Sequence, residues 1–174
     1  MSRYGAGRNR ASEEGIIKNK HERARFYFSD GSVLRFCDVR RFGTVEWSKE
    51  GAMPKLGINP LAAELTKEFL EERFGRSSRA IKNMLLDQGI ISGIGNIYAD
   101  EVLWTAKINP ERKAGSLSGG EIKKLIESVK KVLRVAIKKG GFTLRDYRRT
   151  GGEPGYYQHS RKVYNREGGL CGRC

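Results

Sequence analysis

The sequence predicts an α+β protein in which short strands precede a set of helices. Between Arg23 and Val39, apolar residues alternate with polar ones, which is the spacing of strands with one buried face. After Pro60, apolar residues recur every three or four positions, which is the spacing of amphipathic helices. The chain has 174 residues and is 38% hydrophobic, enough for one domain or two small ones.

The strand region is predicted to begin with a β-hairpin. Two alternating runs, residues 23–28 and 33–37, flank Asp30-Gly31, a dipeptide typical of tight turns. A further short strand is expected over residues 44–47. Because two or three strands do not form a stable sheet domain alone, we expect part of the partner of this sheet to be missing from the chain.

Helices are predicted in the rest of the chain from apolar periodicity bounded by caps and glycines. They cover approximately residues 61–74, 77–89, 96–107 and 118–139. Their N-terminal caps are expected at Asn59, at Ser77 or Ser78, at Asn96 and at Ser118, which forms a capping box with Glu121. Gly75 and Gly140-Gly141 are the expected stops.

Composition excludes several classes of protein. No run approaches the roughly 18 apolar residues of a membrane span, and the first ten residues lack the apolar core of a secretion signal. The three cysteines, Cys37, Cys171 and Cys174, do not make a disulfide framework. We therefore expect a cytoplasmic protein that makes no contact with a membrane.

The chain carries a formal net charge of +14, and the excess is uneven. Residues 1–50 and 134–174 have net charges of +4 and +7, whereas residues 51–133 have only +3. A basic skew at both ends suggests a polyanion that is held between segments. A solvated basic surface, such as that of a ribosomal protein, would produce the same composition.

Residues 93–96, Gly-Ile-Gly-Asn, are predicted to open a helix at an anion-binding turn. Asn96 is a favourable N-cap, and Gly93 and Gly95 remove the Cβ atoms that would keep a neighbouring molecule off the backbone. Exposed N–H groups at such a helix start bind phosphate, and DNA phosphate is the anion that the charge suggests. The alternative is a tight turn between helices with no ligand.

Arg40-Arg41-Phe42 places two guanidinium groups beside an aromatic ring. In a DNA-binding protein, the ring of Phe42 would wedge into a base step, and an arginine would satisfy the base left unpaired when its partner swings out. In the alternative, Phe42 lies in the core and the arginines are solvated.

Further candidates for phosphate binding are Arg76, Arg79, Lys82 and His21. Arg79 and Lys82 are expected on one face of a helix because they are three positions apart. The alternatives are a solvated helix surface and a structural histidine.

Cys171-x-x-Cys174 has the spacing of one half of a tetrahedral zinc site. A site of four cysteines needs a second pair about 15–20 residues further along, beyond the last residue of this sequence. A redox pair and two inactive thiols are the alternatives.

Together, these motifs resemble the bacterial formamidopyrimidine-DNA glycosylases, whose family includes endonuclease VIII. The matching stretches, from about residue 20 to the end, are KHERARFYFSDG, DVRRFG, IKNMLLDQGIISGIGNIYADEVLW, SLSGGEI, GGFTLRDYRRTGGEPGYYQHSRKVYNREG and CGRC. The long penultimate stretch favours the branch of the family that acts on formamidopyrimidines and 8-oxoguanine.

The resemblance implies three segments and assigns roles by matching position. The segments are a partial N-terminal β-sandwich (1–58), a helix–two-turn–helix domain (59–141), and a lesion-loop region with the first half of a zinc finger (142–174). Phe42 resembles the intercalating wedge, and Arg40 resembles the side chain that faces the orphaned cytosine. The other implied contacts are phosphate ligands (His21, Lys82, Asn96), a lesion loop that starts at Arg145, and the first zinc pair (Cys171, Cys174).

The implied activity is excision of an oxidised purine from duplex DNA, followed by strand cleavage through β,δ-elimination. In the family, the amine of an N-terminal proline attacks the sugar, and a glutamate beside it serves as acid and base. This sequence begins Met-Ser-Arg and resembles a family member truncated at both ends. It is therefore expected to be either the body of a glycosylase and AP lyase, or a monomeric module that binds damaged duplex DNA without excising bases.

Overall fold

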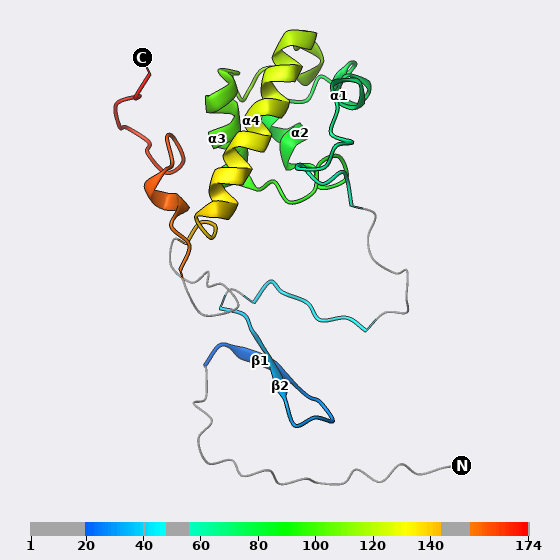
Figure 1. Cartoon of the computed structure of the whole chain (residues 1–174), viewed down its shortest axis with the longest axis vertical. Coiled ribbons are helices and arrows are strands. Elements are labelled where there is room, and N and C mark those ends of the chain that lie inside the picture. The colour runs from blue at the N-terminus through cyan, green and yellow to red at the C-terminus, as the bar shows by residue number, and fades with distance from the viewer. Residues whose placement is uncertain (1–19, 40, 48–55, 144–153, 174) are drawn as a thin grey trace, which may run out of the picture. The chain divides into compact units, whose positions relative to one another are not determined.

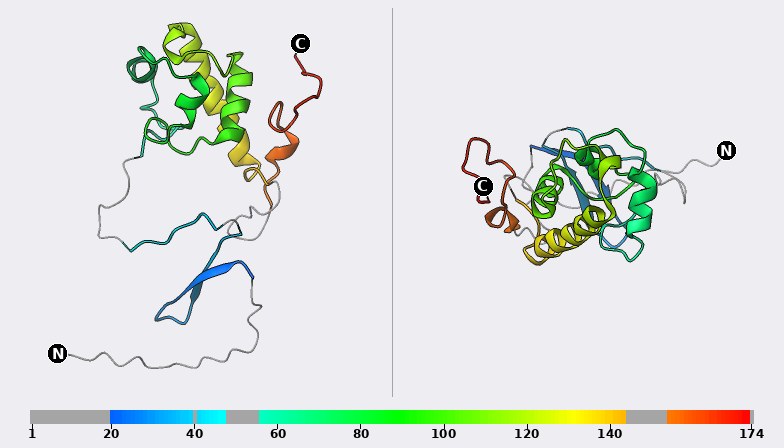
Figure 2. Two further views of the ribbon diagram at one scale, coloured as in Figure 1. Left: turned by 180° about the vertical axis from the view of Figure 1, so that it is seen from behind. Right: turned by 90° about the horizontal axis from the view of Figure 1, so that it is seen from above.

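The computed structural model describes residues 20–39, 41–47, 56–143 and 154–173. The chain divides into two compact units, Met1–Met53 and Pro54–Cys174. The first contains a β-hairpin and the second a group of helices (Figures 1 and 2), which confirms the α+β class. None of the described helices is long and apolar enough to cross a lipid bilayer.

The predicted hairpin is present in the first unit. Strand β1 (Glu22–Tyr27) pairs antiparallel with β2 (Val33–Cys37), with a register irregularity near the start of β1. Gly31 at the turn has φ +83°, a left-handed conformation that glycine adopts without strain. Asp30 stabilises the same turn, because its Oδ1 accepts a hydrogen bond from Ser32 N at 2.8 Å.

The two faces of the hairpin differ in chemistry, because successive side chains of a strand point to opposite sides. The register places on one face Ala24, Phe26, Leu34 and Phe36, and on the other Arg25, Tyr27, Val33 and Arg35.

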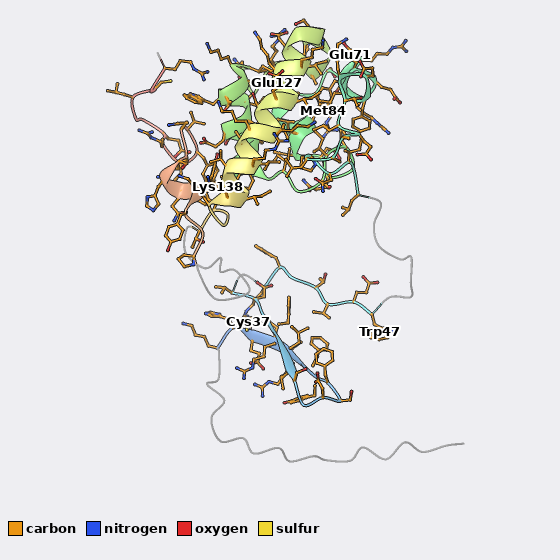
Figure 3. All side chains as sticks on the ribbon, in the orientation of Figure 1. Cys37, Trp47, Glu71, Met84, Glu127 and Lys138 are labelled. Atoms are coloured by element: carbon orange, nitrogen blue, oxygen red, sulfur yellow. The ribbon has the colours of Figure 1, made fainter. Side chains whose placement is uncertain are left out.

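The expected strand over residues 44–47 was wrong. These residues pair with no other described strand, and Trp47 is 98% exposed (Figure 3).

Four α-helices and two short 3-10 turns form the described part of the second unit. The α-helices are α1 (Lys67–Phe74), α2 (Ile81–Leu86), α3 (Asn96–Ala106) and α4 (Gly119–Lys138). The 3-10 turns are η1 (Ala114–Ser116) and η2 (Tyr157–His159). The capping box of Ser118 and Glu121 at the start of α4 and the stop at Gly75 are as predicted.

The caps predicted for the first two helices were wrong, because local turns use the same side chains. Thr66 caps α1, which begins six residues later than expected, and Asn59 instead accepts a hydrogen bond from Leu61 N in a turn. Helix α2 has no side-chain cap, since Ser77 Oγ accepts from Arg79 N before the helix begins. Asparagine and serine close such turns as readily as they cap helices, so sequence preference alone does not distinguish them.

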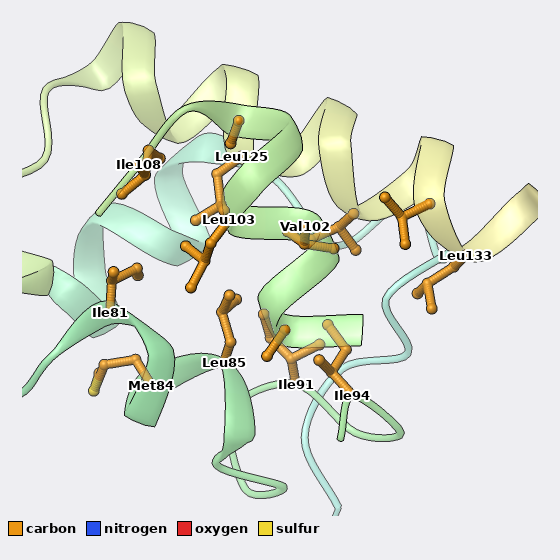
Figure 4. Close-up of a cluster of buried hydrophobic side chains, with 14 of the residues drawn as sticks. Ile81, Met84, Leu85, Ile91, Ile94, Val102, Leu103, Ile108, Leu125 and Leu133 are labelled. Atoms are coloured by element: carbon orange, nitrogen blue, oxygen red, sulfur yellow. The ribbon is translucent and has the colours of Figure 1, made fainter. Parts of the chain in front are cut away.

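A single apolar core holds the helices together, and α3 and α4 pack along each other within it (Figures 1 and 4). The amphipathic stripe predicted for α4 is buried at Ile122, Leu125, Val129, Val132, Leu133 and Ala136. It meets side chains of α2 and α3 that include Ile81, Leu85, Val102 and Leu103. Burying each such aliphatic side chain contributes about 1.5–3 kcal/mol, so the start of α3 is attached to a rigid support.

Candidate nucleic-acid interface

The first turn of α3 carries no side-chain cap. Gly95 is the N-cap residue, and because glycine has no side chain it makes no capping hydrogen bond to the first N–H groups of the helix. The prediction that Asn96 is the cap was wrong, because Gly95 already has the extended backbone of an N-cap and Asn96 is the first helical residue. Asn96 is exposed, and N–H groups at this helix start point towards a position suited to an anion.

The glycines of this turn differ in why they are needed. Gly93 has φ +81°, which favours glycine for conformational reasons. Gly95 has φ −104° and ψ −178°, ordinary extended backbone that any residue adopts. A Cβ built on Gly95 would have no atom within 4 Å. Nothing in the described part of the chain therefore requires glycine at 95, whereas a molecule that approaches the backbone from outside would require it.

Gln88 supports this turn from within, a role that no motif in the sequence predicted. Its side-chain amide donates to Ile94 O at 2.9 Å and accepts from Gly93 N at 2.7 Å. A parallel bridge adds a second support, in which Ile58 N donates to Ile90 O at 3.0 Å. The turn is therefore held in one shape before any ligand arrives.

Two of the basic side chains around α2, those of Arg79 and Lys82, are paired with carboxylates. Lys82 Nζ lies 2.7 Å from Asp100 Oδ1, one helical turn beyond the start of α3, so this lysine lies beside the first turns of that helix. Arg79 precedes α2 and does not share a helix face with Lys82, which corrects the prediction. The Arg79 guanidinium binds Asp87 at 2.9 Å and lowers the pKa of that carboxyl. Arg76 is exposed. Such half-exposed ion pairs are weak, so a phosphate can compete for these cations.

The candidate wedge in the first unit is accessible. Phe42 is 84% exposed, so the described residues do not bury it as a core residue. Arg41 beside it is exposed and has φ +61°. His21 is half-buried at the start of the hairpin. Arg40 lies outside the described residues.

The C-terminal segment is fastened to α3 by a buried carboxylate that sequence reasoning missed. Glu101 is only 2% exposed, and it accepts hydrogen bonds at 2.8–3.0 Å from three consecutive backbone N–H groups, those of Lys162, Val163 and Tyr164. Nearby, the ring of Tyr157 packs edge-on against Tyr98, and burial raises the pKa of Tyr157. The only signal in the sequence was an acidic residue inside an apolar helical stretch.

The chain closes on itself where the lesion loop is predicted. Gly155 N donates to Thr143 Oγ1 at 2.8 Å, which joins the two described ends of this loop. Arg145 itself lies outside the described residues.

A pocket of about 580 Å³ adjoins the start of α3 and the end of α4, and Gly93 and Tyr98 are among its lining residues.

The described residues provide no complete metal site. Cys171 is exposed, Cys174 lies outside the described residues, and no three histidine, cysteine or acidic side chains in the described ranges cluster as metal ligands. Two thiolates supply half of a tetrahedral zinc site, so the residues present do not by themselves fit the ion. The segment before Cys174 is held against α3 by Arg173, whose guanidinium lies 4.0 Å from the centre of the Trp104 ring.

Comparisons with known proteins show which family this chain is similar to. Residues 56–148 match the family model described as the formamidopyrimidine-DNA glycosylase H2TH domain. A formamidopyrimidine-DNA glycosylase of Yersinia enterocolitica is 41% identical over 173 residues, which cover 97% of this chain and 64% of the relative. This chain therefore spans less than two thirds of the length of that protein.

Solved structures of the same kind superpose closely. The complex of Lactococcus lactis Fpg with DNA that contains an abasic site has a TM-score of 0.80 at 37% identity, over 92% of this chain and 61% of that one. MutM in complex with DNA that contains carbocyclic 8-oxo-G has a TM-score of 0.80 at 38% identity, over 92% of this chain and 60% of that one.

Proposed function

The chain belongs to the formamidopyrimidine-DNA glycosylase family, and from this we propose that it binds duplex DNA containing an oxidised purine or an abasic site. It would be the DNA-binding body of a glycosylase and AP lyase that acts in base-excision repair. We expect it to work as a monomer on chromosomal DNA in a bacterial cytoplasm. The hairpin would belong to a β-sandwich domain, residues 1–58, and residues 59–141 would form the helix–two-turn–helix domain.

The observation that carries the proposal is the uncapped start of α3. Its N-cap residue, Gly95, provides no capping side chain, and a Cβ at that position would meet open space. A DNA phosphate fits both facts, because it is an anion and because its sugar–phosphate backbone is too bulky to approach past a Cβ. Solved relatives at TM-score 0.80 hold abasic-site DNA and 8-oxo-G DNA.

The other candidate residues would add further phosphate contacts along the duplex. Lys82 would exchange Asp100 for a phosphate oxygen, and His21, Arg76 and Arg79 would add backbone contacts that fix the register on the duplex. Such contacts carry no sequence information, and the net charge of +14 would make binding strongly dependent on salt.

Phe42 would recognise damage through the low cost of unstacking a damaged site more than through the identity of the base. Its exposed ring would enter the stack where a nucleotide leaves, and Arg40 would satisfy the orphaned partner base. Unstacking costs least at a damaged or missing base, so a wedge selects such sites. The loop that contains Arg145 would then close over the extruded nucleotide.

Base excision requires chemistry beyond this contact surface. The family resemblance assigns the nucleophile to an N-terminal proline amine, and none of the candidate contact residues named above supplies such a secondary amine. We therefore propose that this polypeptide, taken alone, binds damaged DNA without excising the base. A parent protein that carries an N-terminal Pro-Glu would perform the complete reaction.

Borohydride trapping separates binding from catalysis. The chain would be incubated with abasic and 8-oxoguanine duplexes in the presence of borohydride, which fixes an iminium between protein and sugar. We expect salt-sensitive binding to both duplexes and no covalent adduct. An adduct with release of the lesion base would establish the catalytic alternative, and binding to neither duplex would refute both.

Zinc provides a separate test. Cys171 and Cys174 would be the first pair of a zinc-finger hairpin, and a structural zinc ion would fix the fold of that hairpin. With this pair alone, we expect the monomer to retain no stoichiometric zinc. One metal ion per chain in native mass spectrometry would contradict that expectation.

A further inference from the structure

One carboxylate closes the loop that presents the candidate wedge. Asp38 Oδ1 accepts a hydrogen bond from Arg41 N at 3.0 Å, and its Oδ2 accepts one from Gly43 N at 2.6 Å. These two donors flank Phe42, so the backbone is tied down on both sides of the exposed ring. Hydrogen bonds to a charged acceptor are stronger than those between neutral groups, which makes this an effective clamp.

The shape of the loop needs such a clamp. Arg41 has φ +61°, a left-handed conformation that is unfavourable for a residue with a Cβ atom. Residues hold such conformations where surrounding contacts fix them, and these positions concentrate at binding sites. Gly43 lies close against the hairpin, because a Cβ there would be 2.6 Å from Phe36 Cζ and 3.0 Å from Asp38 Oδ2.

Asp38 also connects this loop to the start of the hairpin. Its own N–H donates to His21 O at 2.9 Å, and its carbonyl oxygen accepts from Arg23 Nε at 3.2 Å. The side chain of Asp38 thus holds the candidate wedge, while its backbone holds the candidate phosphate ligand His21. One residue therefore sets the spacing between two predicted DNA contacts.

We propose that Asp38 is a positioning residue for DNA damage recognition, which holds the ring of Phe42 ready for insertion beside His21. The proposal rests on the proposed function, because the ring of Phe42 has a base stack to enter only if the chain binds damaged DNA. A loop ordered before binding loses less conformational freedom when the ring enters the base stack. Asp38 itself need not touch the DNA.

If Asp38 had a purely structural role, its loss would weaken binding to the intact and abasic duplexes equally. The hairpin offers a matched control for this alternative. Asp30, at the other end of the same hairpin, accepts from Ser32 N at 2.8 Å, and hydrogen bonds from the Ser32 side chain and backbone lower the pKa of its carboxyl. Replacing Asp30 or Asp38 removes the same charge and a local acceptor from one small unit. Only the loss of Asp38 releases the loop that carries Phe42.

The experiment measures the ratio of dissociation constants for intact and abasic duplexes, using the full 174-residue chain and fluorescence anisotropy. Asp38→Ala and Phe42→Ala are each expected to lower this ratio about tenfold, which is the size expected for the lost charge-assisted hydrogen bonds or a lost stacked ring. The double variant is expected to lower it no further than Phe42→Ala, because both changes remove the same insertion. Asp30→Ala should leave the ratio unchanged.

The outcomes separate the two proposals. A wild-type ratio for Asp38→Ala, an equal loss on both duplexes, or additive losses in the double variant would each overturn the positioning role while leaving the proposed function standing. A wild-type chain with no preference for the abasic duplex would overturn the proposed function and this inference with it. If circular dichroism shows that Asp38→Ala does not fold, Asp38→Asn, which keeps one acceptor oxygen, should lower the ratio about threefold. An unchanged ratio in Asp38→Asn would then count against the role.

Discussion

Replacing Gly95 by aspartate is predicted to stabilise the fold and weaken DNA binding at the same time. The extended backbone at Gly95 accepts any residue, and its Cβ position is open. An aspartate there would supply the capping side chain that glycine lacks at this N-cap position of α3. A capping carboxylate at a helix start is worth about 0.3–1 kcal/mol, so we expect the melting temperature to rise by about 1–5 °C.

The effect on DNA has the opposite sign, because the new carboxylate would occupy the position proposed for a phosphate. Loss of one charge-assisted contact costs about 1.5–3 kcal/mol, which corresponds to a weakening of about 10- to 100-fold. Thermal unfolding followed by circular dichroism gives the first quantity. Fluorescence anisotropy with an abasic duplex at fixed salt gives the second.

Gly120→Asp is the matched control. Gly120 lies in the first turn of α4, is exposed, and has no atom within 4 Å of a Cβ built on it. Aspartate there changes the net charge equally and also favours its helix, so we expect a small gain in stability and less than about threefold weakening of DNA binding. If Gly95→Asp binds the abasic duplex as tightly as Gly120→Asp, the proposed phosphate site at α3 is refuted.

Other predictions test the buried Glu101 contact, the capping box and the wedge. Glu101→Gln replaces a buried acceptor by an amide N–H₂, so hydrogen exchange at the amides of residues 162–164 should quicken about tenfold or more while α4 stays protected. Unchanged exchange would show that Glu101 does not hold the C-terminal segment. The Arg112 guanidinium lowers the pKa of Glu121 to about 2, below the ordinary 4.5, so this stabilisation is complete above about pH 4.5 and is lost as the pH falls towards 2. Glu121→Gln should flatten the acid unfolding curve in that window, and an identical curve would contradict the assignment. Phe42→Ala should weaken binding to damaged DNA more than binding to intact DNA, and equal losses would count against insertion.

Much of the fold could be predicted because the determining signals are local. The hairpin follows from strict alternation around Asp30-Gly31, and α4 follows from a capping box ahead of a long amphipathic stripe. The caps at Asn59 and Asn96 were wrong for a local reason as well. Asparagine suits turns and helix starts alike, and only the backbone angles of its neighbours decide which one forms.

Candidate site residues could be named from the sequence where residue types are distinctive, and supporting residues were missed where their partners are distant in sequence. The Gly93–Asn96 turn and the Arg-Arg-Phe stretch are unusual enough to be recognised as short motifs. Glu101 binds backbone N–H groups 61–63 residues further along the chain, and no spacing rule reveals such a pairing. Gln88 and Asp38 act within a few residues, but through backbone donors that every residue possesses.

The preference of the chain for damaged over intact duplex DNA tests the account most directly. A labelled duplex with one abasic site would be titrated with the chain at about 0.15 M salt, where screening removes much of the non-specific attraction. An unlabelled intact duplex of the same sequence would then compete for the bound chain. We predict that at least about a tenfold excess of intact duplex is needed to displace half of it. Displacement by an equal amount of intact duplex would contradict the central claim.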